Sequence, residues 1–176
     1  MAMLDDLRIA FHGESNACVK YVGFAKRADE EGYGPVASLF RAAAAAEEIH
    51  ARNHAQVIKS LGGSASADIA SFEVRSTREN LAEAVQGETY ERDVMYPTFI
   101  RNADGNKQAI RTFQWALDAE AEHARLYAEA LADLDAWRGG RRPFWVCPTC
   151  GRTAASEPVD PCPTCGAKKE KFKLVD

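Results

Sequence analysis

The 176-residue sequence predicts a mainly α-helical protein, built as a four-helix bundle followed by a small metal-binding module. Three observations lead to this prediction. Four long segments carry helix-start and helix-stop signals and show no alternating strand pattern. A single long connection divides these segments into two pairs. Four of the five cysteines lie within the last thirty residues, which marks a separate small unit.

The first pair of helices is delimited by glycine and proline. The first helix is expected from about Leu4 to Glu31, where the sequence "GYGP" at 32–35 stops it. Pro35 suits the first turn of the second helix, because a backbone N–H at that position would have no helical partner and proline has none to leave unpaired. The second helix is expected to end at the glycine pair 62–63.

The second pair begins with a capping signal. Ser76 is followed three residues later by Glu79, a combination in which each side chain bonds to the other residue's backbone N–H. The third helix is expected to continue to about Ala103. The turn "DGN" at 104–106 leads into the fourth helix, which is expected to reach residues 137–138 before the glycine pair 139–140.

The connection from Gly62 to Arg75 is long enough to run the full length of the bundle. Helices of roughly 25 residues are about 38 Å long. The fourteen residues of the connection would span about 46–50 Å if extended. A crossover of this kind joins the two halves of ferritin-like bundles, so the length permits that topology.

Composition excludes several classes of partner. The net charge is −4, from 22 basic and 26 acidic residues, which gives no electrostatic reason to expect binding to nucleic acid. No apolar run approaches the roughly 18 residues of a membrane-spanning helix. The first residues, "MAMLDDLRIAF", carry two aspartates where a secretory signal would carry basic residues. We therefore expect a soluble cytoplasmic protein without a nucleic-acid or membrane partner.

The two halves of the helical region repeat the same acidic and histidine positions. The Glu-x-x-His motifs at 47–50 ("EEIH") and 120–123 ("EAEH") start 73 residues apart. Upstream, "GESNA" and "GETYE" place Glu14 and Glu88 74 residues apart. We interpret the helical region as a duplicated two-helix unit.

The repeated residues are suited to hold two metal ions. In a Glu-x-x-His motif both side chains lie on one helix face, about 5–6 Å apart at Cβ, and offer an oxygen and a nitrogen to one site. A glutamate from each of two helices and a Glu-x-x-His from each of the other two form the di-iron carboxylate arrangement. The predicted members are Glu14, Glu47, His50, Glu88, Glu120 and His123.

One acidic residue breaks the repeat. Glu91 lies one turn after Glu88, where the first half has Ala17. The site would then hold five carboxylates and two histidines, and five negative charges exceed the four positive charges of two ferrous ions. We therefore expect one ligand that attaches or leaves as the metal changes its oxidation state.

The cysteine module carries two "CPTC" motifs, each followed by glycine. Their cysteines are Cys147, Cys150, Cys162 and Cys165. Two Cys-x-x-Cys pairs in a short segment predict a tetrahedral four-thiolate metal site rather than disulfides. Zinc and iron both accept four thiolates, and the spacing does not separate them. Cys18 stands apart, and we expect it to be a small buried residue.

The sequence resembles the rubrerythrin family over essentially its whole length. The resemblance rests on "FHGESNACVKY" (11–21), "EEIHA" (47–51), "GETYERDVMYP" (87–97), "AEAEHARLY" (119–127) and "WVCPTCG…PCPTCG". It implies a ferritin-like di-iron bundle over residues 1–138 and a rubredoxin-like iron domain over 139–176. The residue after the first "CG" departs from the family pattern, because Arg152 stands where an aromatic residue is common.

The resemblance also implies roles for individual residues. It assigns iron ligation to Glu14, Glu47, Glu88, Glu91, Glu120 and His123. In the family, one iron moves between the counterparts of Glu91 (oxidised) and His50 (reduced), which makes these two the expected catalytic ligands. Tyr21 and Tyr96 belong to matched motifs and are expected to hydrogen-bond the ligating carboxylates. His54 has Tyr127 as its repeat counterpart, so we expect a surface or packed histidine rather than a ligand.

The function implied by the resemblance is reduction of hydrogen peroxide to water in oxidative-stress defence. Two ferrous ions would supply two electrons, and a reductase or rubredoxin-like carrier would restore them through the four-cysteine iron. In the family the relay often serves the bundle of a partner subunit, so the resemblance also implies a homodimer. Two alternatives stay open: oxidation of ferrous iron for storage, and a non-catalytic metal-bound scaffold whose C-terminal module is a zinc ribbon.

Overall fold

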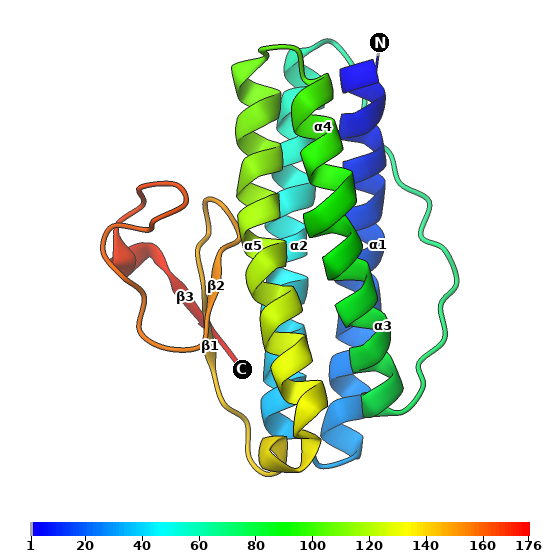
Figure 1. The fold of residues 1–176 in the computed structure, drawn as a ribbon, viewed down its shortest axis with the longest axis vertical. Helices are drawn as coiled ribbons and strands as arrows, with labels where there is room; N and C mark the ends of the chain where they lie inside the picture. Colours follow the sequence, from blue (N-terminus) through cyan, green and yellow to red (C-terminus); the bar gives the residue numbers. More distant parts are fainter. Residues whose placement is uncertain (1) are drawn as a thin grey trace.

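Four long helical segments run side by side in the computed structural model, which describes residues 2–176 (Figure 1). The third segment is a composite of two α-helices with a π-helical turn between them. The elements are α1 (Ala2–Glu30), α2 (Gly34–Ser60), α3 (Thr77–Tyr90), η1 (Glu91–Met95), α4 (Tyr96–Asn102) and α5 (Lys107–Ala132). The predicted ferritin-like bundle is confirmed, with α1 packed on α2 and α3 on α5.

The connection between α2 and α3 crosses the whole length of the bundle, as its length permits (Figure 1). It is fastened to α1 by Asn16, whose side chain donates to the carbonyl of Asp68 and accepts from the N–H of Ala70, at 3.2 and 2.8 Å. Further along, Phe72 packs closely against Gly23. The predicted Ser76–Glu79 capping box is present where α3 begins.

The π-helical turn η1 has a cause in the sequence. Pro97 lacks a backbone N–H, and its ring conflicts with the carbonyl four residues earlier, so an uninterrupted α-helix is disfavoured at this point. The N–H of Tyr96 bonds instead to the carbonyl of Glu91, five residues earlier. Such turns are frequent at functional sites, and this one carries Glu91.

The fourth helix ends earlier than predicted. It stops at Ala132, and residues Leu134–Trp137 form a 3₁₀ turn, η2. Asp133 leaves the helical conformation (φ −139°, ψ 71°), and its side chain accepts the N–H of Ala136. A local side-chain bond therefore competes with the helix at this aspartate.

The C-terminal module is a small antiparallel sheet against one side of the bundle (Figure 1). Strand β1 (Phe144–Val146) lies between β2 (Thr153–Ala154) and β3 (Lys173–Val175), and the short 3₁₀ turn η3 (Lys169–Lys171) precedes β3. Trp137 stacks on Phe144, with ring centroids 6.5 Å apart. The module therefore packs on the side of the bundle, where β1 contacts α2 and β2 contacts α5 (Figure 1).

Two apolar clusters fill the bundle on either side of a polar layer. One includes Tyr21, Phe40 and Tyr127, and the other includes Tyr96 and Phe113. The predicted metal-ligating residues lie in the layer between them. Within residues 2–176, no helix combines the length and the apolar character that crossing a membrane requires.

Candidate metal centres

The six residues of the predicted duplicated site come together in the centre of the bundle. Each of the four helical segments contributes at least one, and none is more than 1% exposed. Their ligand atoms form two groups of four, each within 4.8 Å, and the two groups share Glu47 and Glu120. One group is completed by Glu14 and His50. The other is completed by Glu88 and His123.

Both histidines turn Nδ1 toward the shared glutamates. Nδ1 of His50 lies 2.9 Å from Glu47 Oε2 and 3.0 Å from Glu120 Oε1. Nδ1 of His123 lies 2.8 Å from Glu120 Oε2 and 3.3 Å from Glu47 Oε1. The two shared carboxylates thus lie between two histidine nitrogens, as bridging ligands of a two-metal site would.

The protein groups alone leave this cluster electrostatically strained. Burial, followed by repulsion from neighbouring carboxylates, raises the pKa of Glu14 and of Glu120 well above the usual value. Burial alone would also raise the pKa of Glu47, but His123 and His50 lower it to about 2. Burial would lower the pKa of His123, yet Glu47 and Glu120 raise it well above its ordinary range. The cluster holds more negative charge than its two histidines can balance.

Glu14 Oε2 and Glu88 Oε2 have no hydrogen-bond partner within residues 2–176. Glu47 Oε1 and Glu120 Oε1 lie close to histidine Nδ1 atoms but also accept no hydrogen bond within those residues. A buried acceptor without a partner costs about 1–3 kcal/mol, and more when it is charged. Two divalent cations would satisfy these oxygens and neutralise the carboxylates. The residues present therefore fit a pair of bound iron ions.

Two tyrosines hold the outer glutamates across the bundle. Tyr21 on α1 donates to Oε1 of Glu88 on α3, at 2.5 Å. Tyr96 on α4 donates to Oε1 of Glu14 on α1. Each half of the duplicated unit thereby orients the lone glutamate of the other half. These are the contacts expected for Tyr21 and Tyr96 as supporting groups.

Glu91 is the one predicted ligand that lies outside both groups. It begins the π-helical turn η1, and its Oε1 approaches Gly13, where an added Cβ would lie 3.9 Å away. Burial, and then Glu88 and Glu120, raise the pKa of Glu91 well above its usual value. His50, by contrast, lies inside the first group. The predicted exchange between Glu91 and His50 stays a prediction.

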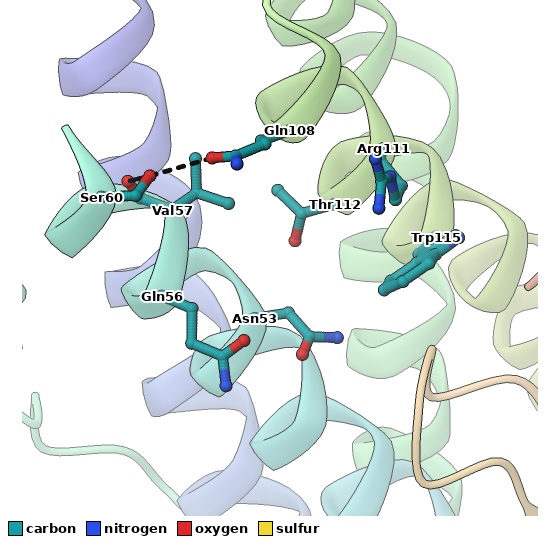
Figure 2. Close-up of a pocket in the computed structure, with 8 residues that line it drawn as sticks. All are labelled: Asn53, Gln56, Val57, Ser60, Gln108, Arg111, Thr112 and Trp115. Atoms are coloured by element: carbon teal, nitrogen blue, oxygen red, sulfur yellow. Dashed lines mark hydrogen bonds between the residues drawn. The ribbon is translucent and has the colours of Figure 1, made fainter.

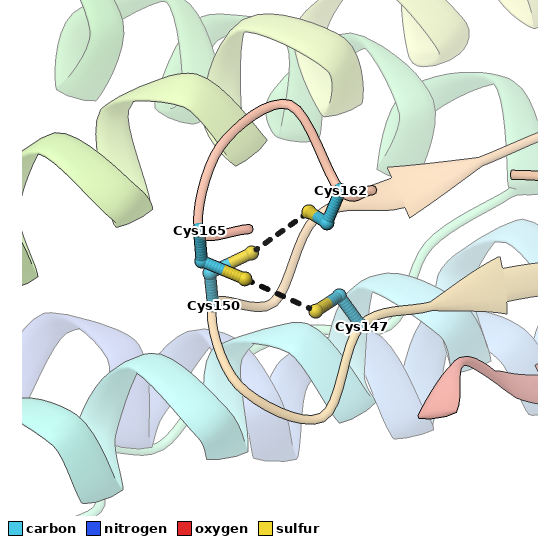
Figure 3. A group of neighbouring side chains, drawn as sticks. All are labelled: Cys147, Cys150, Cys162 and Cys165. Atoms are coloured by element: carbon cyan, nitrogen blue, oxygen red, sulfur yellow. Dashed lines mark hydrogen bonds between the residues drawn. The ribbon is translucent and has the colours of Figure 1, made fainter. Parts of the chain in front are cut away.

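The four cysteines of the C-terminal module converge as expected (Figure 3). Their Sγ atoms lie within 4.8 Å of one another, with Cys147–Cys165 and Cys150–Cys162 at 3.6 and 3.8 Å. Among the described residues these cysteines form no disulfide. Gly151, at φ +80°, follows the first pair, and its N–H bonds to the carbonyl of Cys147. This is the tight turn that lets two thiolates face one metal.

The cysteine module contacts both histidines of the bundle site. Nε2 of His50 lies 3.1 Å from the carbonyl oxygen of Cys150, and Nε2 of His123 lies 2.9 Å from Oγ1 of Thr153. Gly151 lies directly against the His50 ring, and any Cβ there would overlap the imidazole. Both histidines are therefore held at Nε2 while Nδ1 faces the carboxylates. Sequence reasoning missed these contacts.

His54 is buried and hydrogen-bonded, and it belongs to neither metal group. Its Nε2 lies 3.2 Å from the Tyr96 hydroxyl and its Nδ1 lies 3.0 Å from Oγ1 of Thr112. Burial, with a smaller effect from His50, lowers the pKa of His54 to about 3. The expectation of a packed histidine was therefore correct, but it did not include the bond to Tyr96.

Comparison with known proteins agrees with both parts of this architecture. Residues 5–131 match the family model described as Rubrerythrin. Residues 145–173 match the model described as Rubrerythrin, rubredoxin-like domain. The donor sets are those of a di-iron carboxylate site and a rubredoxin-like four-cysteine iron site.

Several curated proteins and solved structures are similar along most of the chain. Rubrerythrin-2 of Clostridium acetobutylicum is 36% identical, covering 96% of this chain and 94% of its own length. Nigerythrin of Nitratidesulfovibrio vulgaris is 41% identical, covering 84% of this chain and 74% of its own. A structure titled as fully reduced, all-ferrous nigerythrin matches with a TM-score of 0.88 and 39% identity, over 98% of this chain and 86% of that one. A Desulfovibrio desulfuricans bacterioferritin, 21% identical with a TM-score of 0.69 over 77% of this chain and 81% of that one, shares the fold alone.

Proposed function

The chain belongs to the rubrerythrin family, and from this premise we propose that it is a non-haem di-iron peroxidase that reduces hydrogen peroxide to water. The observation that supports the proposal most strongly is the pair of buried ligand groups that share Glu47 and Glu120, with the four-cysteine module in contact with their histidines. A storage protein has no need of that second metal module.

When bound, the two ferrous ions supply the two electrons that, with two protons, convert one hydrogen peroxide molecule into two water molecules. The chain's own residues provide the setting for this chemistry. Glu47 and Glu120 belong to both ligand groups and would hold both metal ions. Tyr21 and Tyr96 donate hydrogen bonds to Glu88 and Glu14 and keep these two carboxylates in place. The aromatic clusters above and below the polar layer limit access of bulk water.

The four-cysteine module is proposed to pass electrons to the bundle. It supports this role by position, because the carbonyl of Cys150 contacts Nε2 of His50. A network of backbone acceptors fastens the same turn to α2: Arg52 donates to Pro148, and Asn53 donates to Thr149, at 2.8 and 2.9 Å. The relay cysteines and the bundle histidines are thereby held as one unit.

The remaining assignments are proposed on the same basis. We take residues 1–138 as the di-iron domain and 139–176 as the rubredoxin-like domain. Glu91 and His50 are proposed as exchanging iron ligands. A reductase or rubredoxin-like carrier is proposed as the electron donor, and a homodimer as the assembly. Cysteines that bind a metal ion rather than form disulfides suit a reducing compartment such as the cytoplasm, which we propose as the location.

The visible spectrum of the iron-loaded protein tests this function. The protein should be red, should bleach on anaerobic reduction and should recover its colour when hydrogen peroxide is added. A colourless protein with zinc in the four-cysteine site would contradict the electron-relay role. Rapid accumulation of many iron ions per chain under air would favour ferrous oxidation for storage instead.

A further inference from the structure

A line of buried polar side chains runs from the surface between α2 and α5 to the di-iron site. Thr112 contacts Nδ1 of His54 at 3.0 Å, Nε2 of His54 contacts the Tyr96 hydroxyl at 3.2 Å, and Tyr96 bonds to Glu14. No member is more than 4% exposed. Thr112 and His54 are outside the predicted ligand set, so their polar groups at this position require an explanation.

The outer end of the line reaches a surface pocket of about 280 Å³, most of whose lining residues carry polar side chains. Thr112 lies in its wall together with Asn53 and Gln56 of α2 and Gln108 and Arg111 of α5 (Figure 2). A pocket of this volume with several polar partners has room for water molecules. Thr112 therefore lies between this pocket and the buried ring of His54.

The hydrogen bonds of the line have one consistent direction. Tyr96 has a single hydroxyl proton, and that proton is donated to Glu14. The Tyr96 oxygen must then accept from Nε2–H of His54. A neutral His54 protonated at Nε2 has a free lone pair at Nδ1, which accepts from Thr112.

The duplicated half of the molecule has no such line. The repeat spacing of 73 residues pairs His54 with Tyr127 and Thr112 with Leu39. Tyr21 occupies the place of Tyr96 and bonds to Glu88, but the Tyr127 hydroxyl beside it has no hydrogen-bond partner within residues 2–176. The Tyr127 ring packs on Tyr21 with centroids 5.6 Å apart, inside the aromatic cluster. One half of the site is closed by apolar groups, whereas the other is linked to a solvent pocket.

We propose that Thr112 and His54 are positioning residues that hold the Tyr96 hydroxyl on Glu14 and thereby set the geometry of the Glu14–His50 metal position. The proposal rests on the proposed function only in taking Glu14 and His50 as iron ligands. Because Tyr96 donates to Glu14 Oε1, its oxygen accepts from Nε2–H of His54, and Nδ1 of His54 accepts from Thr112. These bonds hold Tyr96 on Oε1 of Glu14 and leave Oε2 free for a metal. The pocket supplies solvent to the outer end of the line.

Nitrogen-15 NMR of the histidine rings tests the direction of the line without any turnover. The full chain loaded with Zn²⁺ in both sites should show a neutral His54 protonated at Nε2. Thr112→Val should shift the His54 ring signals, and Thr112→Ser should restore them. A cationic His54, or one protonated at Nδ1, would overturn the proposal.

Ferrous-iron binding tests the consequence for the metal site. Loss of a group that supports a metal ligand typically weakens binding 10–100-fold. We expect a loss in that range for His54→Phe and a smaller one for Thr112→Val, with recovery in Thr112→Ser. The matched control is Tyr127→Phe, which removes the counterpart hydroxyl and should leave binding unchanged. Equal effects of Thr112→Val and Tyr127→Phe would overturn the proposal. Neither the NMR measurement nor the iron titration involves peroxide. If both gave the predicted results and the protein had no peroxidase activity, the proposed function would be refuted and this inference would stand.

Discussion

The carbonyl oxygen of Cys150 lies 3.1 Å from Nε2 of His50, so the four-cysteine site and the di-iron site touch within a single chain. This contact joins the Cys147–Cys150 turn of the four-cysteine site to His50, a member of one ligand group of the bundle. It depends on a glycine, because Gly151 lies where any side chain would overlap the His50 ring.

Gly151→Ala should therefore separate the two sites. The substitution adds a Cβ at the imidazole and places alanine at φ +80°, which costs about 1–2 kcal/mol for a residue other than glycine. We expect electron transfer from the four-cysteine iron to the bundle to slow, because the added Cβ forces the cysteine turn away from His50. Stopped-flow absorbance during reduction measures this rate.

Gly166→Ala is the matched control for this substitution. Gly166 closes the second cysteine turn at φ +75°, but no atom lies within 4 Å of its added Cβ. The control shares the backbone strain and lacks the overlap with His50. If both variants transferred electrons at the same rate, the contact at Gly151 would not matter for the relay.

Thr153→Val should weaken iron binding at the His123 position. The substitution keeps the side-chain shape and removes the hydroxyl that meets Nε2 of His123 at 2.9 Å. Groups that orient a ligating histidine typically contribute 10–100-fold to metal affinity. Ferrous-iron titration of the valine variant should show a loss in this range, and Thr153→Ser should bind as the parent does. Parental affinity in Thr153→Val would show that the hydroxyl has no part in holding His123.

Glu91→Ala should affect iron binding more in the ferric state of the site than in the ferrous state. Glu91 lies outside both ligand groups, so ferrous binding should change less than it does when a member of either group is replaced. If Glu91 ligates iron after oxidation, the variant should lose part of its iron when it is oxidised. Iron counted per chain before and after oxidation gives the answer, with Glu48→Ala as a control on an exposed neighbour of the site. Equal iron retention by the parent and the variant would remove Glu91 from the ligand set.

Raising the pH should destabilise the bundle when its metal site is empty. The pKa values of Glu14, Glu120 and His123 are all raised in the folded chain, so the folded state binds more protons than the unfolded state as pH rises above their ordinary values. Stability from these groups is therefore lost with increasing pH. The lowered pKa of His54 acts in the opposite direction only below about pH 6.5. Above about pH 6.5 His54 no longer opposes the trend, so the comparison is made there.

Bound metal should reverse this trend, because ligands bind it in their deprotonated form. Urea unfolding at pH 7 and pH 9 would compare chains with an empty and a zinc-filled bundle, both with zinc on the cysteines so that their contribution cancels. The difference in the free energy of unfolding should widen at the higher pH. A difference that narrows would show that the buried carboxylates are not the groups that the metal relieves.

The sequence predicted those parts of the fold and the site that depend on local signals and internal repetition. The capping box at Ser76 follows from the position of Glu79 three residues later. The pairing of Glu47 with Glu120 follows from the repeated Glu-x-x-His motif, whose two side chains share one helix face. The end of α5 was misplaced because Asp133 forms a local cap that competes with a continuing helix. The π-helical turn at Glu91 was missed although Pro97 was a visible signal for it.

The contacts that link distant segments could not be predicted in this way. Cys150 meets His50 across 100 residues, and Thr153 meets His123 across 30, so no helical period relates them. The sequence accounted for Gly151 by the tight turn after Cys150. It gave no sign that the same glycine also lies against the His50 ring. His54 was judged by its mismatch with Tyr127, and that mismatch proved to be the informative feature.

The most direct test of the central claim is a stoichiometric reaction of the fully reduced, iron-loaded protein under anaerobic conditions. One equivalent of hydrogen peroxide should oxidise both ferrous ions of the bundle in each chain and yield water, and it should do so much faster than one equivalent of dioxygen. A bundle site that stays ferrous with peroxide, or that reacts faster with dioxygen, would contradict the assignment of this protein as a peroxidase.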